Sequence, residues 1–271
     1  MDLSQIGNIH IFRLPIDTSL LAIIRQQLWA SVDRIPDIHN LLAAVPCKRI
    51  DRQPFTYLSA LPHQLLKGNT PSTPYSSTQI LGNYLLENLA ATSYDKPTTQ
   101  WQGTANDQGY LYLQPSNEAI TAWLNHLLSI KNSVTNSYFF PPETYSSTTL
   151  QYINIRCSQL LEFFPQTPLA LPEITITCAA QTTTTVQQEL IGAIADIWDH
   201  IAAFTPERHR RILSLSRQLV ENFLEFEKNC CLGNKKNQIT INLDYGLLAI
   251  VQITVKLILQ TYWDLDPLSH W

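Results

Sequence analysis

Apolar residues in the first half of the chain recur at the spacing of amphipathic helices, with shorter apolar stretches between them. Leu20, Ile24 and Leu28 mark the first of these helices, and Gly109 opens a short stretch that alternates like a strand. The pattern predicts helices over 18–33, 76–89 and 116–128 and a strand over 109–113. Helices mixed with at least one strand predict a small α+β domain over residues 1–128.

The second half carries longer apolar stripes of helical period, which predict an all-α helical bundle over residues 146–271. Helices are expected over 150–161, 186–204, 206–229 and 244–263. The irregular stretch 165–185 interrupts them, and Ile174–Thr177 within it is expected to form an extended hairpin. A polar linker over 129–145, which contains Pro141 and Pro142, separates the two halves.

Four blocks of the second half carry a resemblance to a known family. They are Leu-Gln-Tyr-Ile-Asn-Ile-Arg-Cys-Ser-Gln-Leu-Leu at 150–161, Gln-Glu-Leu-Ile-Gly-Ala-Ile-Ala-Asp at 188–196, the stretch 208–230, and 245–271 with its ending Leu-Asp-Pro-Leu-Ser-His-Trp. They resemble the DALR anticodon-binding domain of arginyl-tRNA synthetases, which are class I enzymes. The resemblance implies a helical domain that binds a tRNA anticodon.

The first half resembles a second part of the same enzymes. The segment 55–66 (Phe-Thr-Tyr-Leu-Ser-Ala-Leu-Pro-His-Gln-Leu-Leu) and the segment 109–114 (Gly-Tyr-Leu-Tyr-Leu-Gln) stand where the family has Gly-Asp-Tyr-Ala-type and Gly-Phe-Ile-Asn-Phe-Arg segments. The order of elements is similar to the additional N-terminal domain of arginyl-tRNA synthetases, which in that family contacts the tRNA elbow. The catalytic domain would then be missing between about Leu128 and Ser146.

The motifs with which a class I synthetase handles ATP are missing from the sequence. The only methionine is Met1, which excludes a Lys-Met-Ser-Lys-type loop, and no two histidines flank a glycine. The eight glycines form neither a G-x-G-x-x-G pattern nor a P-loop. We therefore expect a protein that is not an enzyme and uses no cofactor.

A metal site, a disulfide framework and a membrane span have little support in the sequence. Asp196, Asp199 and His200 have a helical spacing that metal ligands use, but a solvated helix face accounts for the trio, and no metal is expected. The five cysteines include no C-x-x-C pair. The N-terminus lacks the pattern of a secretory signal, and no apolar stretch is expected to reach the roughly 18 residues of a membrane span. A soluble, cytoplasmic protein is expected.

The charge distribution weighs against strong RNA binding. The net charge is −4, and the whole of it comes from the part after Pro142, where nine basic residues face thirteen acidic ones. Dedicated RNA binders usually carry a basic excess, because contacts with phosphates dominate their affinity. Any RNA binding is therefore expected to depend on stacking and hydrogen bonds.

Aromatic and basic residues of the second half are the candidate contacts with an anticodon stem and loop. They are Trp271, Trp263, Tyr152, Arg156, Arg210, Arg217, Lys235 and Lys236. The family's C-terminal tail lies near the anticodon, so the resemblance makes Trp271 the preferred stacking platform, a role that suits a large aromatic ring. For Trp263 and Trp271 the alternative is a role as core anchors. For Arg210 and Arg217 the alternative is an ordinary exposed helix face.

The first half offers a second set of candidates. Lys48, Arg49 and Arg52 form its only dense basic cluster, which is either a solvated loop or a contact with the tRNA elbow. Tyr110 matches the aromatic residue that the family places beside a D-loop base. Tyr112 replaces the family's asparagine there, so the resemblance implies stacking without that asparagine's hydrogen bonds.

Two functions of different classes follow. The first is a non-catalytic tRNA-binding protein, specific for an arginine acceptor, which acts as an adaptor or regulator and presents the tRNA to a protein partner such as a modifying enzyme or a synthetase. The alternative is a protein–protein interaction scaffold that has kept the fold and lost RNA binding, which the acidic second half favours.

Overall fold

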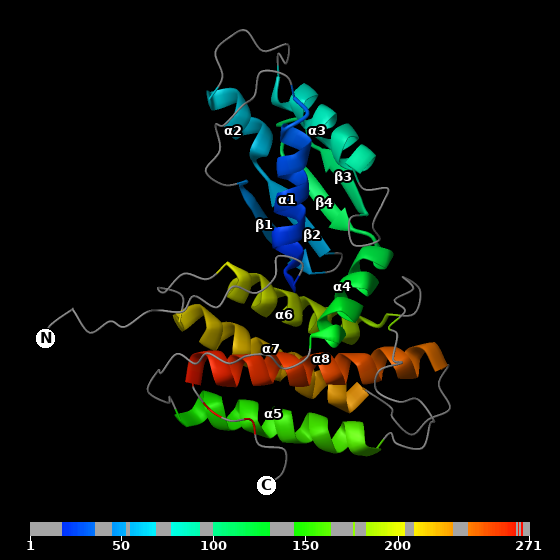
Figure 1. The fold of residues 1–271 in the computed structure, drawn as a ribbon, viewed down its shortest axis with the longest axis vertical. Coiled ribbons are helices and arrows are strands. Elements are labelled where there is room, and N and C mark those ends of the chain that lie inside the picture. Colours follow the sequence, from blue (N-terminus) through cyan, green and yellow to red (C-terminus); the bar gives the residue numbers. More distant parts are fainter. Residues whose placement is uncertain are drawn as a thin grey trace, which may run out of the picture.

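The computed structural model describes residues 18–35, 45–52, 55–68, 77–92, 100–130, 144–163, 176, 183–203, 209–229, 238–263, 265 and 267. Figure 1 shows an N-terminal region with helices and a sheet, stacked on a C-terminal region made of helices. The elements are α1 (Leu20–Val32), β1 (Cys47–Arg52), β2 (Phe55–Ser59), α2 (Leu61–Gly68), α3 (Thr78–Thr92), β3 (Trp101–Ala105), β4 (Leu111–Pro115), α4 (Asn117–Ser129), α5 (Thr144–Phe163), α6 (Thr185–Ala202), α7 (His209–Asn229) and α8 (Gln238–Trp263).

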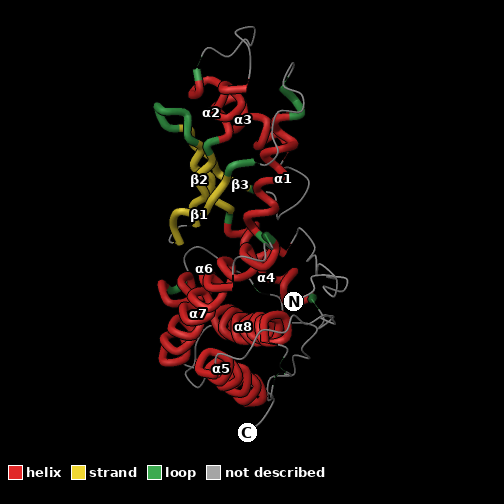
Figure 2. The backbone as a smooth tube through the Cα atoms, turned by 90° about the vertical axis from the view of Figure 1, so that its left-hand side faces the viewer, coloured by secondary structure: helices red, strands yellow, loops and turns green. Residues whose placement is uncertain are grey.

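The N-terminal sheet is antiparallel, with the strand order β1-β2-β4-β3. Helices α1 and α3 cover one of its faces, and within the described ranges no helix covers the other face (Figure 2). Tyr57, Leu111 and Leu113 are fully buried under the helices. Because successive strand residues point to opposite faces, the residues that alternate with these three along β2 and β4 project to the face without helices.

The C-terminal region packs α5, α6, α7 and α8 into a bundle around Phe223, Leu247 and Ile258, which are all fully buried. Its helix α8 corrects one expectation. The stretch Asn242–Trp263 is long and apolar enough to cross a membrane by length and composition, although the sequence reading found no such stretch. In the structure 72% of its most apolar window is buried inside the protein, as in a core helix.

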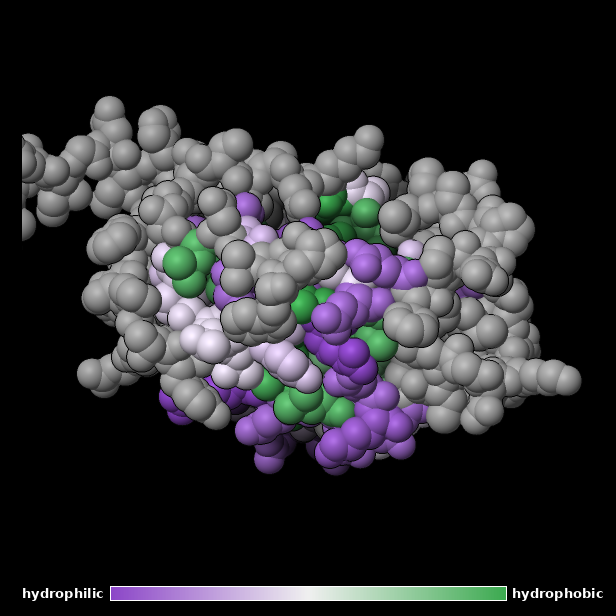
Figure 3. Space-filling view, turned by 90° about the horizontal axis from the view of Figure 1, so that it is seen from below, coloured by the Kyte–Doolittle hydropathy of each residue, from purple (hydrophilic) through white to green (hydrophobic). Residues whose placement is uncertain are grey.

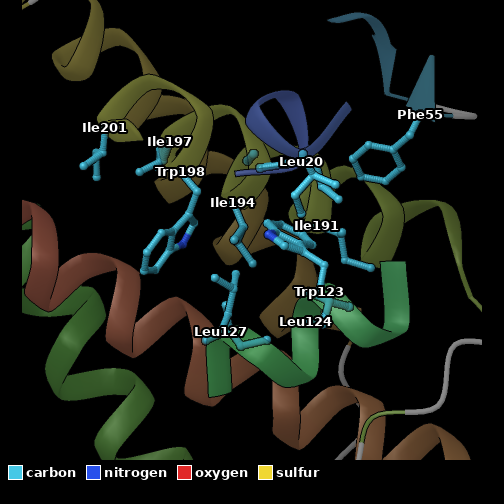
Figure 4. Packing of buried hydrophobic residues seen from close by; sticks show 14 of the residues in the cluster. Leu20, Phe55, Trp123, Leu124, Leu127, Ile191, Ile194, Ile197, Trp198 and Ile201 are labelled. Carbon is cyan, nitrogen blue, oxygen red and sulfur yellow. The ribbon is translucent and has the colours of Figure 1, made fainter. Parts of the chain in front are cut away.

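The two regions share an apolar contact surface. Trp123 and Leu127 of α4 lie against Ile191 and Ile194 of α6 in one continuous cluster (Figure 4). The indole Nε1–H of Trp123 donates to the carbonyl oxygen of Thr18 at 3.0 Å, so the ring is fixed at its polar end as well. Helix α4 therefore joins the sheet region to the bundle.

The seven predicted helices are confirmed, with shifted ends, whereas three strands and one helix were missed. The strand expected over 109–113 is β4 at Leu111–Pro115, and β1, β2, β3 and α2 were not predicted. Gly109 lies in the turn before β4, with a φ of +82° that favours glycine. Apart from Ile176, the expected hairpin over 174–177 lies outside the described residues, as do residues 131–143 of the linker.

Candidate nucleic-acid interface

One row of side chains crosses all four strands on the open face of the sheet. Lys48 of β1 pairs with Leu58 of β2, Leu58 pairs with Tyr112 of β4, and Tyr112 pairs with Thr104 of β3. Lys48 and Thr104 are exposed, whereas Leu58 and Tyr112 are half-buried. A phenol ring therefore lies near the middle of an open sheet, with an ammonium group in the same row. We call this surface the open face.

A second row on the open face carries polar, uncharged side chains across β3, β4 and β2. Gln102 of β3 pairs with Gln114 of β4, and the side-chain Nε2–H of Gln114 donates to Thr56 Oγ1 of β2 at 3.1 Å. Amide side chains carry both donors and acceptors, which is what base edges require of a partner.

Tyr110 extends the aromatic surface at the start of β4. Its ring lies 4.5 Å from the imidazole ring of His63 in α2, centroid to centroid, at a tilt of 41°. The turn before it is fixed by Asn106, whose side-chain oxygen accepts the backbone N–H of Tyr110 at 2.8 Å and that of Gln108 at 3.1 Å. Tyr110 and Tyr112, two residues apart, are thus both set by the β3–β4 hairpin.

Arg49 is turned away from the open face and belongs to the contact between the two regions. Its guanidinium group forms an ion pair with Asp196 of α6, donates to the carbonyl oxygen of Gly192 at 2.8 Å and lies 5.5 Å from the Phe55 ring centroid. Only 6% of its side chain is exposed. Arg49 is therefore engaged within the protein, while its neighbour Lys48 faces solvent.

Asp199 makes a second polar contact between the two regions. Its Oδ1 accepts the hydroxyl of Ser19 at 2.7 Å and the backbone N–H of Leu21 at 3.0 Å, and Ser19 itself caps α1 through the N–H of Ala22. A carboxylate at a helix N-terminus is favoured by the helix dipole. Among the described residues no three His, Cys, Asp or Glu side chains are grouped to hold a metal.

Burial raises the pKa of Asp199 above the ordinary carboxyl range, against the opposing effects of Arg49 and of the hydrogen bonds from Leu21 and Ser19. A raised native pKa makes the native state lose stability, relative to the unfolded chain, as the pH rises through that value. Asp199→Asn keeps an acceptor for Ser19 and Leu21 and removes this titration. The free energy of unfolding, measured with urea, should be higher for Asp199→Asn than for wild type. This difference should be larger at about pH 7 than at about pH 4. An equal difference at both pH values would contradict a raised pKa of Asp199 in the folded protein.

The bundle residues chosen from the sequence are placed less favourably for RNA. Tyr152 on α5 is 42% exposed, but Arg156, one turn further, forms an ion pair with Glu227 of α7. Arg217 is exposed on α7, and Glu221 is exposed one turn after it. The face on the α5 side mixes hydrophilic side chains with small apolar areas (Figure 3).

The remaining candidates are either buried or outside the described part. Trp263 is only 2% exposed and belongs to the core, so it offers no ring face for stacking. Trp271, Lys235 and Lys236 lie outside the described residues, and for Arg52 and Arg210 only the backbone is described.

The sequence reading missed Leu58, Thr104, Gln102, Gln114 and His63 as parts of this surface. The alternation of Leu111 and Leu113 with Tyr112 and Gln114 in the sequence was a signal that could have placed Gln114 on the same face as Tyr112. The pairing that brings residues of four strands together gave no signal in the sequence.

Comparisons with family models, with curated proteins and with solved structures gave no match to this chain.

Proposed function

We propose that this protein is a non-catalytic RNA-binding protein whose open face contacts single-stranded or looped bases. The observation that carries the proposal is the row Lys48–Leu58–Tyr112–Thr104, in which an aromatic ring and a cation share an open antiparallel sheet. Proteins that bind single-stranded nucleic acid stack bases on aromatic side chains and hold the backbone with basic ones. The amide pair Gln114 and Gln102 adds hydrogen-bonding groups beside the ring.

The RNA that we propose is a tRNA, with an arginine acceptor as first choice. The support is the residue resemblance of both halves to arginyl-tRNA synthetases, together with the position of Tyr110 and Tyr112 on a surface that can receive a base. Tyr112 offers a ring where the family has an asparagine, so recognition at this point would depend on stacking. An adaptor or regulator is the role that suits a binding surface without catalytic motifs.

The charges of the protein set the expected strength of binding. On the open face Lys48 is the basic residue whose side chain is described, and Arg49 is engaged by Asp196. Few phosphate contacts imply modest affinity and a shallow dependence on salt, compared with strongly basic RNA binders.

Tyr112→Ala should weaken binding of tRNA to the full-length protein by about 1–3 kcal/mol, the range of a base stacked on an aromatic ring. Fluorescence titration with labelled tRNA at low salt measures this. Tyr112→Phe keeps the ring and should retain most of the affinity. Tyr152→Ala is the matched control on the bundle and should bind like wild type. If Tyr152→Ala weakens binding and Tyr112→Ala does not, the open face is the wrong surface.

The scaffold alternative keeps one observation in its favour. Glu221 and Glu225 accompany Arg211, Arg217 and Lys228 on the exposed face of α7, and Glu227 engages Arg156, so the described part of this face has little positive charge to spare for phosphates. Absence of saturable tRNA binding at low salt by the intact protein would favour the scaffold.

A further inference from the structure

Strand β3 ends the sheet, and its hydrogen-bonding groups can be assigned to its two sides. The N–H of Asn106 donates to the carbonyl oxygen of Tyr110 at 3.0 Å, and that of Ser116 donates to Gln100 at 2.9 Å. Hydrogen-bonded pairs alternate along an antiparallel ladder. The register of β3 with β4 therefore turns the backbone N–H and carbonyl groups of Gln102 and Thr104 toward β4. The N–H and carbonyl groups of Trp101, Gly103 and Ala105 point away from the sheet.

The outer edge of β3 is accessible at its centre. Gly103 is exposed. On its inner side it lies directly against α3, since a Cβ at Gly103 would stand 2.3 Å from Cδ2 of Leu86 in that helix. Glycine has no side chain, so the exposed surface at this position is backbone. Gln102 and Thr104 on either side are exposed too.

The two edges of the sheet differ in how they are protected. The β1 edge carries Lys48, Asp51 and Arg52 and has a register shift between Arg49 and Asp51. Charges and bulges of this kind are what native proteins use to prevent pairing at an edge. The β3 segment Trp101–Ala105 has neither charge nor proline, and its pairing with β4 runs without a shift. It keeps the properties of a strand that accepts another strand.

We propose that β3 pairs antiparallel with β3 of a second copy of this chain, about a two-fold axis at Gly103. The segment is self-complementary in that register. Gly103 faces Gly103, and the outward groups of Trp101 meet those of Ala105 in the other copy. On the open face each Gln102 stands opposite Thr104 of the other copy.

Pairing of this kind joins the two sheets into a single sheet of eight strands, with both open faces on the same side. A strand of five residues buries little area, so dissociation constants in the micromolar range are expected. Dimerisation through β3 does not depend on RNA binding and is tested without RNA.

The test is analytical ultracentrifugation of the full chain up to about 100 μM, the range in which small interfaces associate. The weight-average mass should rise from 30.8 kDa toward twice that value. Gln102→Lys/Thr104→Lys sets like charges opposite each other across the axis and should raise the dissociation constant about tenfold or more. Gln102→Glu/Thr104→Lys sets opposite charges there and should restore or strengthen the dimer.

Gln159→Lys/Ser214→Lys adds the same charge at exposed positions of the bundle and should dimerise like wild type. Thermal unfolding shows whether each variant is folded. A wild-type chain that stays monomeric over the whole range overturns the proposal. So does a dimer that tolerates the Lys pair at 102 and 104 as well as the Glu–Lys pair.

Discussion

Replacing Arg49 by Ala is expected to lower the free energy of unfolding by about 3 kcal/mol, because it removes one partner of the ion pair with Asp196. The loss should lie toward the low end of the range for broken buried pairs, since the Asp196 side chain keeps 21% exposure and some hydration. The hydrogen bond to the carbonyl oxygen of Gly192 is lost at the same time. Urea unfolding followed by circular dichroism measures the change.

The adjacent residue provides the matched control. Lys48→Ala removes the same charge from the next position of β1, where the side chain is exposed, and should change stability by less than about 0.5 kcal/mol. The double variant Arg49→Met/Asp196→Leu replaces the pair by apolar groups and should recover most of the loss. Equal effects of Arg49→Ala and Lys48→Ala would contradict the placement of Arg49 between the two regions.

Trp123→Ala is expected to destabilise the protein by about 3–5 kcal/mol, the range for removing a large buried aromatic side chain. Trp123 is fully buried and lies with Leu127 against Ile191 and Ile194 of α6. Its removal leaves a cavity where the sheet region meets the bundle, and it leaves the carbonyl oxygen of Thr18 without its indole donor. Thermal and urea unfolding should both shift.

Trp123→Phe keeps a ring in the cavity and loses the hydrogen bond, so its cost should be clearly smaller. If the alanine variant unfolds in two separate transitions, one of them unchanged from wild type, the two regions are coupled less than their contacts imply. A single transition at lower denaturant concentration is the expected result.

The helices followed from the sequence because their apolar residues repeat with the period of the helix. Leu20, Ile24 and Leu28 of α1 share one buried side, and α4 begins at the expected Ser116 cap. Strands β1 and β3 have no such signal. Four of the six residues of β1 are charged, and β3 is built around Gln102, Gly103 and Thr104. Their extended conformation depends on pairing with β2 and β4, which local sequence does not encode.

The candidate site could be predicted residue by residue but not as a surface. Lys48, Tyr110 and Tyr112 were chosen from the sequence, and the register of the strands decides that Lys48 and Tyr112 lie in one row. Arg49 was chosen for its charge alone. Its partner Asp196 is far away in the chain, so the ion pair between the two residues could not be predicted from the sequence. Trp263 was chosen as an aromatic residue near the chain end, and its burial depends on how α8 packs.

Photocrosslinking of total tRNA to the intact protein at low salt, followed by peptide mapping, tests whether the open face binds RNA. Crosslinks should saturate with tRNA concentration and map to the β4 segment containing Tyr110 and Tyr112, with loss of signal in Tyr112→Ala. Crosslinks confined to α5 and α7, or no saturable crosslinking at all, would contradict RNA recognition by the open face.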